Sequence, residues 1–269
     1  MDETPNIGRQ VTRRRFGAIT GGAFVSFVLG ACDRIGHSLS GAEANDGRLT
    51  ARPRAGVALE TMSSAKGERA LGLDRGRDAM LKLPANATDA PLPLLVLLHG
   101  AGGSGAGVLR RLGAAADDAG VAVLAPDSRD SSWDAIRGGF GGDVTFVNRA
   151  LERVFETVPV DPARIAVGGF SDGATYALSL GLINGDLFRR VVAFSPGFIV
   201  EGPPHGKPRF FISHGTADPI LPIDQCSRVI VPALQRRGYE VTFREFNGGH
   251  EVPADIAREG MGWVVAAGV

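Results

Sequence analysis

The sequence predicts one α/β domain built on a mainly parallel sheet that is flanked by helices. Short apolar runs recur along the chain, as is typical of strands that are covered on both faces. Stretches with apolar residues at helical spacing separate these runs. A parallel pair of strands needs a crossover connection, so this alternation favours a parallel sheet. Polar clusters that directly follow several runs indicate a site at one edge of that sheet.

The first 32 residues are expected to be a targeting segment. Residues 12–16 contain three consecutive arginines before a short, weakly apolar run, which resembles a twin-arginine export signal. The run ends at Leu29-Gly30-Ala31-Cys32, which resembles a bacterial lipobox, although Gly30 stands where Ala or Ser is commoner. We expect a lipid anchor at Cys32 and a periplasmic or cell-envelope lipoprotein. The alternative is an ordinary cleaved signal in which Cys32 is incidental.

Composition sets further limits on partners and compartment. Residues 33–65 are rich in Gly, Ala, Ser and Arg and predict a flexible tether between the anchor and a folded domain over residues 66–269. The 29 basic and 29 acidic residues balance, so the basic footprint of a nucleic-acid partner is missing. The one other cysteine, Cys226, has no intramolecular partner if Cys32 is acylated, and we interpret it as a buried structural thiol.

The expected elements of the domain follow in order. The seven apolar runs that predict strands lie at residues 78–83, 92–98, 121–125, 165–168, 191–194, 210–213 and 240–246. The helical patterns lie at residues 108–119, 144–157, 175–183, 223–237 and 253–266. Asp143 is expected to cap the second helix, Pro222 to open the fourth and Gly238 to end it. Only residues 195–208 separate the fifth and sixth strands, too few for a large cap domain.

A serine stands at the apex of a predicted strand–turn–helix. The motif Gly169-Phe170-Ser171-Asp172-Gly173 directly follows the run at 165–168 and precedes a helical stretch. Glycines two residues on either side of the serine allow a sharp turn and keep side chains off the neighbouring elements. The hydroxyl of Ser171 is therefore expected to lie exposed at the carboxyl end of a strand.

Three more polar clusters follow strands: His99-Gly100-Ala101-Gly102-Gly103, His214-Gly215-Thr216-Ala217-Asp218-Pro219 and Gly248-Gly249-His250-Glu251. The order Ser171, Asp218, His250 is the serine, acid, histidine order of α/β hydrolases. The other histidines are weaker candidates for the base, since His99 and His214 are expected to brace loops and His37 and His205 lie elsewhere. Asp127 and Asp172 are the weaker candidates for the acid.

Residues 78–265 resemble the α/β-hydrolase superfamily and are most similar to its phospholipase/carboxylesterase branch, which includes acyl-protein thioesterase-like esterases. The four motifs above carry this resemblance. It implies an α/β-hydrolase fold and a cofactor-free serine esterase that forms an acyl-Ser171 intermediate. His250 would move the proton and Asp218 would orient the imidazole. The backbone N–H groups of Ala101 and Asp172 would form the oxyanion hole.

The expected substrate is a small or lipid-like ester in an open cleft. Gly102 and Gly103 would let their loop approach the substrate, and Trp133 either lines the pocket or only covers the sheet. No cluster of residues has metal-ligand spacing, so no metal is expected. A polyhydroxyalkanoate depolymerase, a feruloyl-type esterase and an acyltransferase remain alternatives. A non-catalytic binding lipoprotein on the same frame is the alternative of another class.

Overall fold

The computed structural model describes residues 46–54, 57, 67–88 and 90–266. The expected export segment and Cys32 lie outside these residues. Within the described chain, no helix is long and apolar enough to cross a membrane.

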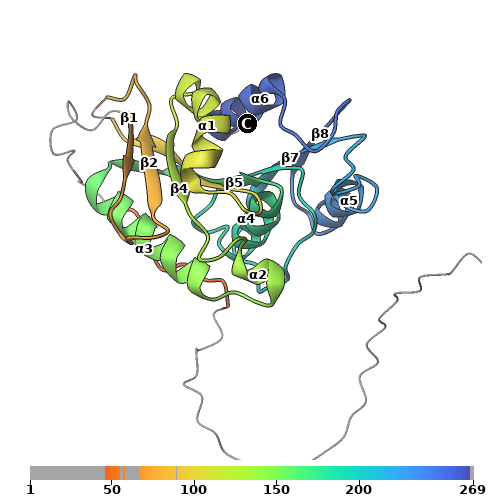
Figure 1. The fold of residues 1–269 in the computed structure, drawn as a ribbon, viewed down its shortest axis with the longest axis horizontal. Coiled ribbons are helices and arrows are strands. Elements are labelled where there is room, and N and C mark those ends of the chain that lie inside the picture. The colour runs from red at the N-terminus through yellow and green to blue at the C-terminus, as the bar shows by residue number, and fades with distance from the viewer. Residues whose placement is uncertain (1–45, 55–56, 58–66, 89, 267–269) are drawn as a thin grey trace, which may run out of the picture. The chain divides into compact units, whose positions relative to one another are not determined.

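One eight-stranded sheet organises the domain (Figure 1). Its strands are β1 (Gly67–Ala70), β2 (Ala79–Leu83), β3 (Leu92–Leu98), β4 (Ala122–Pro126), β5 (Val160–Phe170), β6 (Arg190–Phe194), β7 (Arg209–Gly215) and β8 (Val241–Phe246). They lie in the order β1-β2-β4-β3-β5-β6-β7-β8. The pairs β1–β2 and β2–β4 are antiparallel, and all the others are parallel. The predicted mainly parallel α/β fold is therefore confirmed.

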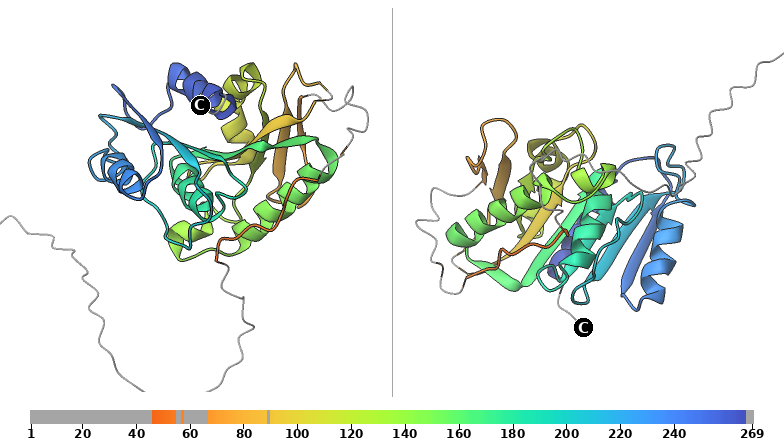
Figure 2. Two further views of the ribbon diagram at one scale, coloured as in Figure 1. Left: turned by 180° about the vertical axis from the view of Figure 1, so that it is seen from behind. Right: turned by 90° about the horizontal axis from the view of Figure 1, so that it is seen from below.

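Helices cover both faces of the sheet, as Figures 1 and 2 show. They are α1 (Gly105–Asp118), α2 (Asp134–Arg137), α3 (Gly142–Thr157), α4 (Asp172–Ile183), α5 (Ser227–Arg236) and α6 (Ala254–Val265). Along β3, Leu95 and Leu97 belong to the apolar cluster with α1 and α6. Leu94, Val96 and Leu98 belong to the cluster with α3, α4 and α5. Successive side chains alternate between two covered faces, which explains the unbroken apolar run.

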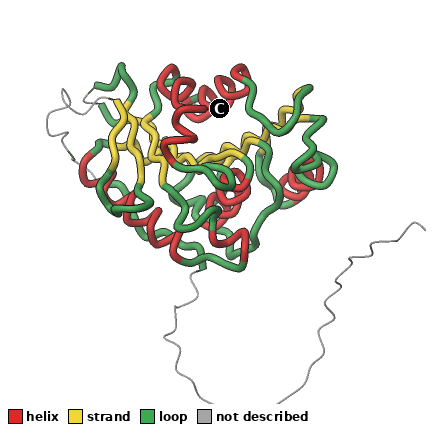
Figure 3. Tube along the Cα trace, in the orientation of Figure 1, coloured by secondary structure: helices red, strands yellow, loops and turns green. Residues whose placement is uncertain are grey.

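The predicted strands are all found, and the differences are local. Two elements were not predicted: β1, a four-residue edge strand without an apolar run, and the single-turn helix α2. The connection from β6 to β7 contains no helix over its described residues 195–208, as expected for a fold without a large cap domain (Figure 3).

Two predicted helix starts were wrong. Asp143 is not the N-cap of α3 but lies in its first turn. Its buried carboxylate instead accepts hydrogen bonds from the N–H groups of Arg129 and Asp134. Helix α5 begins at Ser227 rather than near Pro222, because residues 222–226 form turns closed by Gln225 N–H and Cys226 N–H. Gly238 does follow that helix, with a φ of 78°.

The expectation of a flexible tether is wrong for residues 46–54, which we call the strap. Leu49 and Ala51 are buried against the domain. The side chain of Asn184 accepts from Leu49 N–H at 2.8 Å and donates to the Gly47 carbonyl at 2.8 Å. Figure 2 shows this segment running along α3. Part of the expected tether is therefore an integral layer of the fold.

Candidate active site

Ser171 lies at a strained turn between β5 and α4. Its φ of 58° is in the region that L-residues rarely adopt. Its N–H donates to the Phe194 carbonyl at 3.0 Å, and its carbonyl accepts from Ala174 N–H at 2.9 Å and Thr175 N–H at 3.0 Å. These bonds hold the turn from both sides, so the strained backbone is fixed by the surrounding elements.

The two glycines of the motif are required by close backbone approach. A Cβ on Gly169 would stand 2.5 Å from the Gly173 carbonyl carbon. A Cβ on Gly173 would stand 2.2 Å from the Leu98 carbonyl oxygen. The helix can therefore start directly above β3 only because neither position carries a side chain. This agrees with the reason for which the glycines were singled out in the sequence.

Three side chains that are distant in sequence form one hydrogen-bonded chain. His250 Nε2 lies 2.8 Å from Ser171 Oγ, and His250 Nδ1 lies 2.6 Å from Asp218 Oδ2. An ionised carboxylate only accepts hydrogen bonds, so Nδ1–H donates to Asp218. In the neutral ring, Nε2 is then left to accept the hydroxyl proton of Ser171. The arrangement is that of a nucleophile beside an oriented base.

Asp218 is held as a buried anion. Its side chain is fully buried, and Oδ1 accepts hydrogen bonds from Ile220 N–H and Leu221 N–H, both at 2.9 Å. Burial opposes ionisation, but the hydrogen bonds from Leu221, His250 and Ile220 outweigh it and lower the pKa of Asp218 below its usual value. The structure therefore favours the ionised form of this carboxylate.

His214 braces the loop that carries Asp218. Its Nδ1 lies 2.7 Å from Ser227 Oγ, and its Nε2 lies 2.7 Å from the Leu221 carbonyl. Because a carbonyl only accepts, Nε2–H donates to Leu221 and Nδ1 accepts from Ser227. Burial lowers the pKa of His214. The neutral ring thus fastens the acid loop to α5, the bracing part expected for this residue.

The glycine-rich loop after β3 approaches the serine directly. A Cβ on Gly100 would lie 3.3 Å from the Ser171 Cβ. His99 fixes the loop, since its Nδ1–H donates to the Gly100 carbonyl at 2.7 Å and its Nε2 accepts from Ser128 N–H at 3.0 Å. Burial lowers the pKa of His99, which favours this neutral tautomer. The loop is braced in the position that an oxyanion-binding N–H of Ala101 would need.

Asp172 stands at the start of α4, where the first N–H groups of a helix have no intrahelical partner. Its side chain accepts a hydrogen bond from the Ser132 hydroxyl. The carboxylate is thus occupied, while the backbone N–H keeps its place next to Ser171. Asp127, the other weak candidate for the acid, accepts from Gly105 N–H at 2.6 Å and fixes the start of α1.

The structure excludes the first of the two alternatives for Trp133, in which its side chain lines the substrate pocket. The side chain is completely buried. Its Nε1–H donates to the His99 carbonyl at 2.8 Å, and its ring stacks on Tyr176 at 5.1 Å between centroids. The ring packs beneath the glycine-rich loop and supports it from within. Sequence alone could not distinguish this position from a pocket wall.

Gly102 and Gly103 shape the loop in different ways. Gly102 has a φ of 67° and donates its N–H to the Ser131 carbonyl at 2.6 Å, and it is not among the residues that line the cleft. Gly103 does line the cleft, and its N–H closes a turn to the Gly100 carbonyl at 3.0 Å. Their N–H groups are thus used within the protein, and of the two only the half-buried Gly103 lines the cleft.

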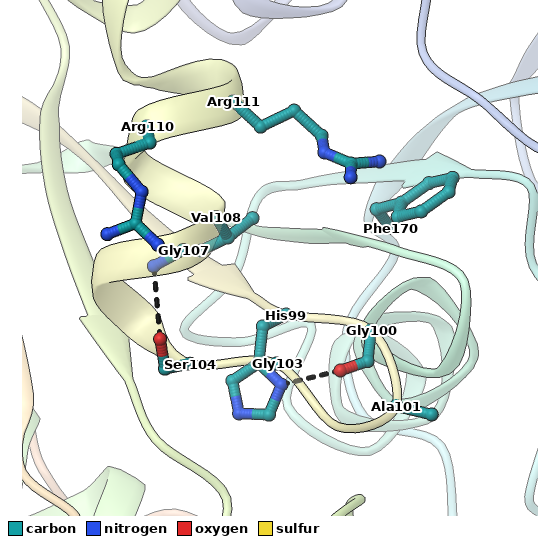
Figure 4. A pocket seen from close by; sticks show the side chains of 10 residues that line it. All are labelled: His99, Gly100, Ala101, Gly103, Ser104, Gly107, Val108, Arg110, Arg111 and Phe170. Atoms are coloured by element: carbon teal, nitrogen blue, oxygen red, sulfur yellow. Dashed lines mark hydrogen bonds between the residues drawn. The ribbon is translucent and has the colours of Figure 1, made fainter.

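An open cleft of about 540 Å³ lies beside this loop (Figure 4). The first turns of α1 form one wall, and Phe170 forms another. The ring of Phe170 also packs on His250, with 4.8 Å between centroids. Sequence reasoning missed Phe170 and the two arginines of α1 that line the cleft. The position of Phe170 next to Ser171 was visible in the sequence. The face of α1 that would line the cleft was not.

Comparisons with known proteins bear on the family and the fold. A family model described as Phospholipase/Carboxylesterase matches residues 144–258, which include Ser171, Asp218 and His250. The matched segment is less than half of the chain, and over it the chain is similar to the phospholipase/carboxylesterase branch of the α/β hydrolases. The glycine-rich loop of this α/β hydrolase lies before the matched segment, so its assignment depends on the fold and the contacts described above.

Two curated relatives and one solved structure illustrate the likeness. The chain is 33% identical over 146 residues to "Putative esterase NocK" of Nocardia uniformis, matching 50% of this chain and 42% of the relative. It is 30% identical to "Feruloyl esterase C" of Emericella nidulans, matching 55% of this chain and 57% of the relative. The chain therefore spans about half the length of these relatives. The Bacillus cereus carboxylesterase superposes with a TM-score of 0.55 at 22% identity, covering 71% of this chain and 94% of the other.

Proposed function

We propose that this α/β hydrolase is a serine carboxylic-ester hydrolase. The observation that carries the proposal is the continuous hydrogen-bonded chain from Ser171 through His250 to Asp218. A serine hydroxyl is a weak nucleophile until a base takes its proton. His250 accepts that proton as Ser171 attacks the ester carbonyl, and Asp218 stabilises the imidazolium that results.

The tetrahedral intermediate needs hydrogen-bond donors for its oxyanion. The N–H groups of Ala101 and Asp172 lie on the two segments that meet at Ser171, and we assign them this part. A single oxyanion donor typically lowers the activation barrier by about 3 kcal/mol. When the intermediate collapses, His250 returns its proton to the leaving alcohol and leaves an acyl-Ser171 ester. A water molecule, activated by the same imidazole, then hydrolyses that ester.

The test is hydrolysis of p-nitrophenyl acetate and butyrate by the full chain. We expect Ser171→Ala and His250→Ala each to lower kcat by about 10⁴-fold or more, because the members of such a chain act as a unit. His205→Ala, a change of an exposed histidine, is the matched control and should retain the activity. Thermal melting of each variant shows whether the fold survives.

Labelling with a fluorophosphonate separates a catalytic from a non-catalytic protein on the same frame. We expect covalent labelling of the wild type and none of Ser171→Ala. A wild-type protein that is neither labelled nor active on any simple ester would refute the proposal. It would favour the alternative of a binding lipoprotein.

A feruloyl-type esterase is the second candidate, because one relative is named feruloyl esterase C. Methyl ferulate compared with p-nitrophenyl butyrate separates the two. A large preference for methyl ferulate would support the feruloyl-type esterase. Failure to hydrolyse methyl ferulate, with p-nitrophenyl butyrate still hydrolysed, would support the general esterase.

We further propose export and a lipid anchor at Cys32. Support comes only from the arginine-rich start and the sequence before Cys32. Labelling of bacterial cells with a radioactive fatty acid should mark the wild type and not Cys32→Ser. Equal labelling of the two would overturn the anchor.

A further inference from the structure

Two guanidinium groups of α1 line the cleft next to Ser171. Arg110 and Arg111 are both exposed residues of its wall. In Figure 4 the side chain of Arg111 extends from the helix toward Phe170, and that of Arg110 runs along α1 toward Gly107. Within the described part of the chain, neither guanidinium makes a hydrogen bond or an ion pair. Arg111 lies over the Phe170 ring, with its Cζ 5.0 Å from the centroid. Both cations thus keep their hydrogen-bond donors available to a ligand.

Other arginines near the site are used to build it. Arg77 donates to the Gly103 carbonyl at 3.1 Å, and Arg129 donates to the Arg77 carbonyl at 2.6 Å. These two hold loops in place, whereas Arg110 and Arg111 support no loop through a hydrogen bond. The described residues that line the cleft include no Asp or Glu, so the positive charge there has no counter-charge on the wall. The cleft is therefore suited to an anionic ligand.

Arg111 lies near the histidine that would protonate the leaving alcohol, through the ring of Phe170. His250 can protonate the leaving oxygen only within hydrogen-bond reach of its Nε2. The Phe170 ring contacts His250 on one side, and Arg111 lies over the same ring. The Phe170 ring thus links the two groups: its centroid lies 4.8 Å from that of the His250 ring and 5.0 Å from Arg111 Cζ, and these two distances limit how far apart imidazole and guanidinium can be. One small alcohol can span that distance.

We propose that the preferred ester carries an anionic group, a carboxylate or a phosphate, on its alcohol part, and that Arg110 and Arg111 bind this group. This inference rests on the proposed esterase function and names its substrate class. Guanidinium groups match the planar geometry of carboxylates and phosphates and bind them through paired N–H donors. Hydrolysis breaks the acyl C–O bond, and water supplies the hydroxyl of the acid and the proton of the anionic alcohol.

The test compares esters with one acyl group and different leaving alcohols. The full chain is assayed with 4-acetoxybenzoate, 4-acetoxyphenyl phosphate and the neutral 4-acetoxybenzamide. Each kcat/KM is divided by the uncatalysed rate of the same ester, to remove differences in leaving-group reactivity. We expect a lower KM for the two anionic esters than for the neutral amide. Comparing the KM values of the two anionic esters then shows whether the carboxylate or the phosphate is bound more tightly. The preference should weaken as ionic strength rises.

Variants then assign the preference to the two arginines. Arg110→Gln and Arg111→Gln should each reduce the anionic-to-neutral ratio by about 2- to 5-fold, the range of an exposed ion pair. Arg111→Lys should retain more of the ratio than Arg111→Gln, because it keeps the charge. Arg153→Gln on α3, an exposed arginine remote from the cleft lining, is the matched control and should leave the ratio unchanged.

The outcomes separate this inference from the proposed function. Activity on the neutral ester without any preference for the anionic ones would overturn the anion subsite and leave the esterase intact. A preference that survives both glutamine substitutions would also overturn it. A preference for mono-4-nitrophenyl succinate over 4-nitrophenyl butyrate, with none for the anionic alcohols, would refute the assignment to the alcohol side. Hydrolysis of none of these esters would contradict the esterase itself.

Discussion

Trp133→Phe tests whether the buried indole supports the glycine-rich loop rather than contacting substrate. The indole N–H donates to the His99 carbonyl at 2.8 Å, and the ring lies 4.9 Å from the His99 ring and 5.1 Å from Tyr176. Phenylalanine keeps much of the stacking but removes the donor and leaves a small void. A buried acceptor that loses its partner costs about 1–3 kcal/mol, and the void adds on the order of 1 kcal/mol.

The expected loss in the free energy of unfolding is therefore about 3 kcal/mol, the middle of that combined range. For a domain of this size the loss corresponds to a melting temperature lower by roughly 6–12 °C. Differential scanning fluorimetry measures this shift. We also expect kcat to fall, because His99 positions the loop that carries Ala101, while KM for short acyl esters changes little.

Trp263→Phe is the matched control. This half-buried tryptophan lies against Arg190 with 5.1 Å between Cζ and ring, and its indole N–H makes no hydrogen bond within the described residues. The same substitution there should lower the melting temperature much less. If Trp133→Phe instead left the melting temperature unchanged and shifted the preference for acyl chain length, the ring would contact substrate and our reasoning would be wrong.

Two further predictions concern the turn and the strap. Gly173→Ala should abolish soluble, active protein, because its Cβ would stand 2.2 Å from a backbone oxygen of Leu98; Gly262→Ala on α6, where nothing lies within 4 Å, should be neutral or stabilising by about 0.5–1 kcal/mol. Comparable expression and melting of the two variants would contradict the packing argument. Asp186 pairs with Arg48 and Arg52 of the strap, and these partners lower its pKa, chiefly through the hydrogen bond from Arg48. The stability that it contributes is therefore present above its ordinary pKa and lost as the pH falls through the lowered one, so the melting-temperature gap between wild type and Asp186→Asn should narrow below about pH 4. A gap independent of pH would show that the ion pairs do not hold the strap.

The core strands could be predicted because their signal is local. A run such as Leu92–Leu98 is apolar at every position, and only a strand covered on both faces accounts for that. The serine turn was equally visible, since the two glycines flank Ser171 at a fixed spacing within five residues. The edge strand β1 escaped prediction because an exposed edge imposes no apolar pattern on its residues.

Residues whose part depends on distant neighbours could not be assigned in this way. The sequence left Trp133 as either a pocket wall or a cover for the sheet, and only the packing of Tyr176 and His99 around it decides between them. Residues 46–54 have the composition of a tether, yet the side chains of Asn184, directly after α4, and Asn148, on α3, supply hydrogen bonds that dock them. Arg110 and Arg111 have no local motif at all.

The amino-acid sequence by itself determined the α/β architecture, the turn that exposes Ser171 and the chain order of serine, acid and histidine. The tertiary structure alone decided which side chains meet: His250 between Ser171 and Asp218, Trp133 beneath the glycine-rich loop, and two arginines on the wall of the cleft. The physical reason is the distance along the chain over which each effect acts. Backbone sterics and hydrophobic periodicity act over a few residues, whereas burial and hydrogen-bond partners are supplied by elements far away in the chain.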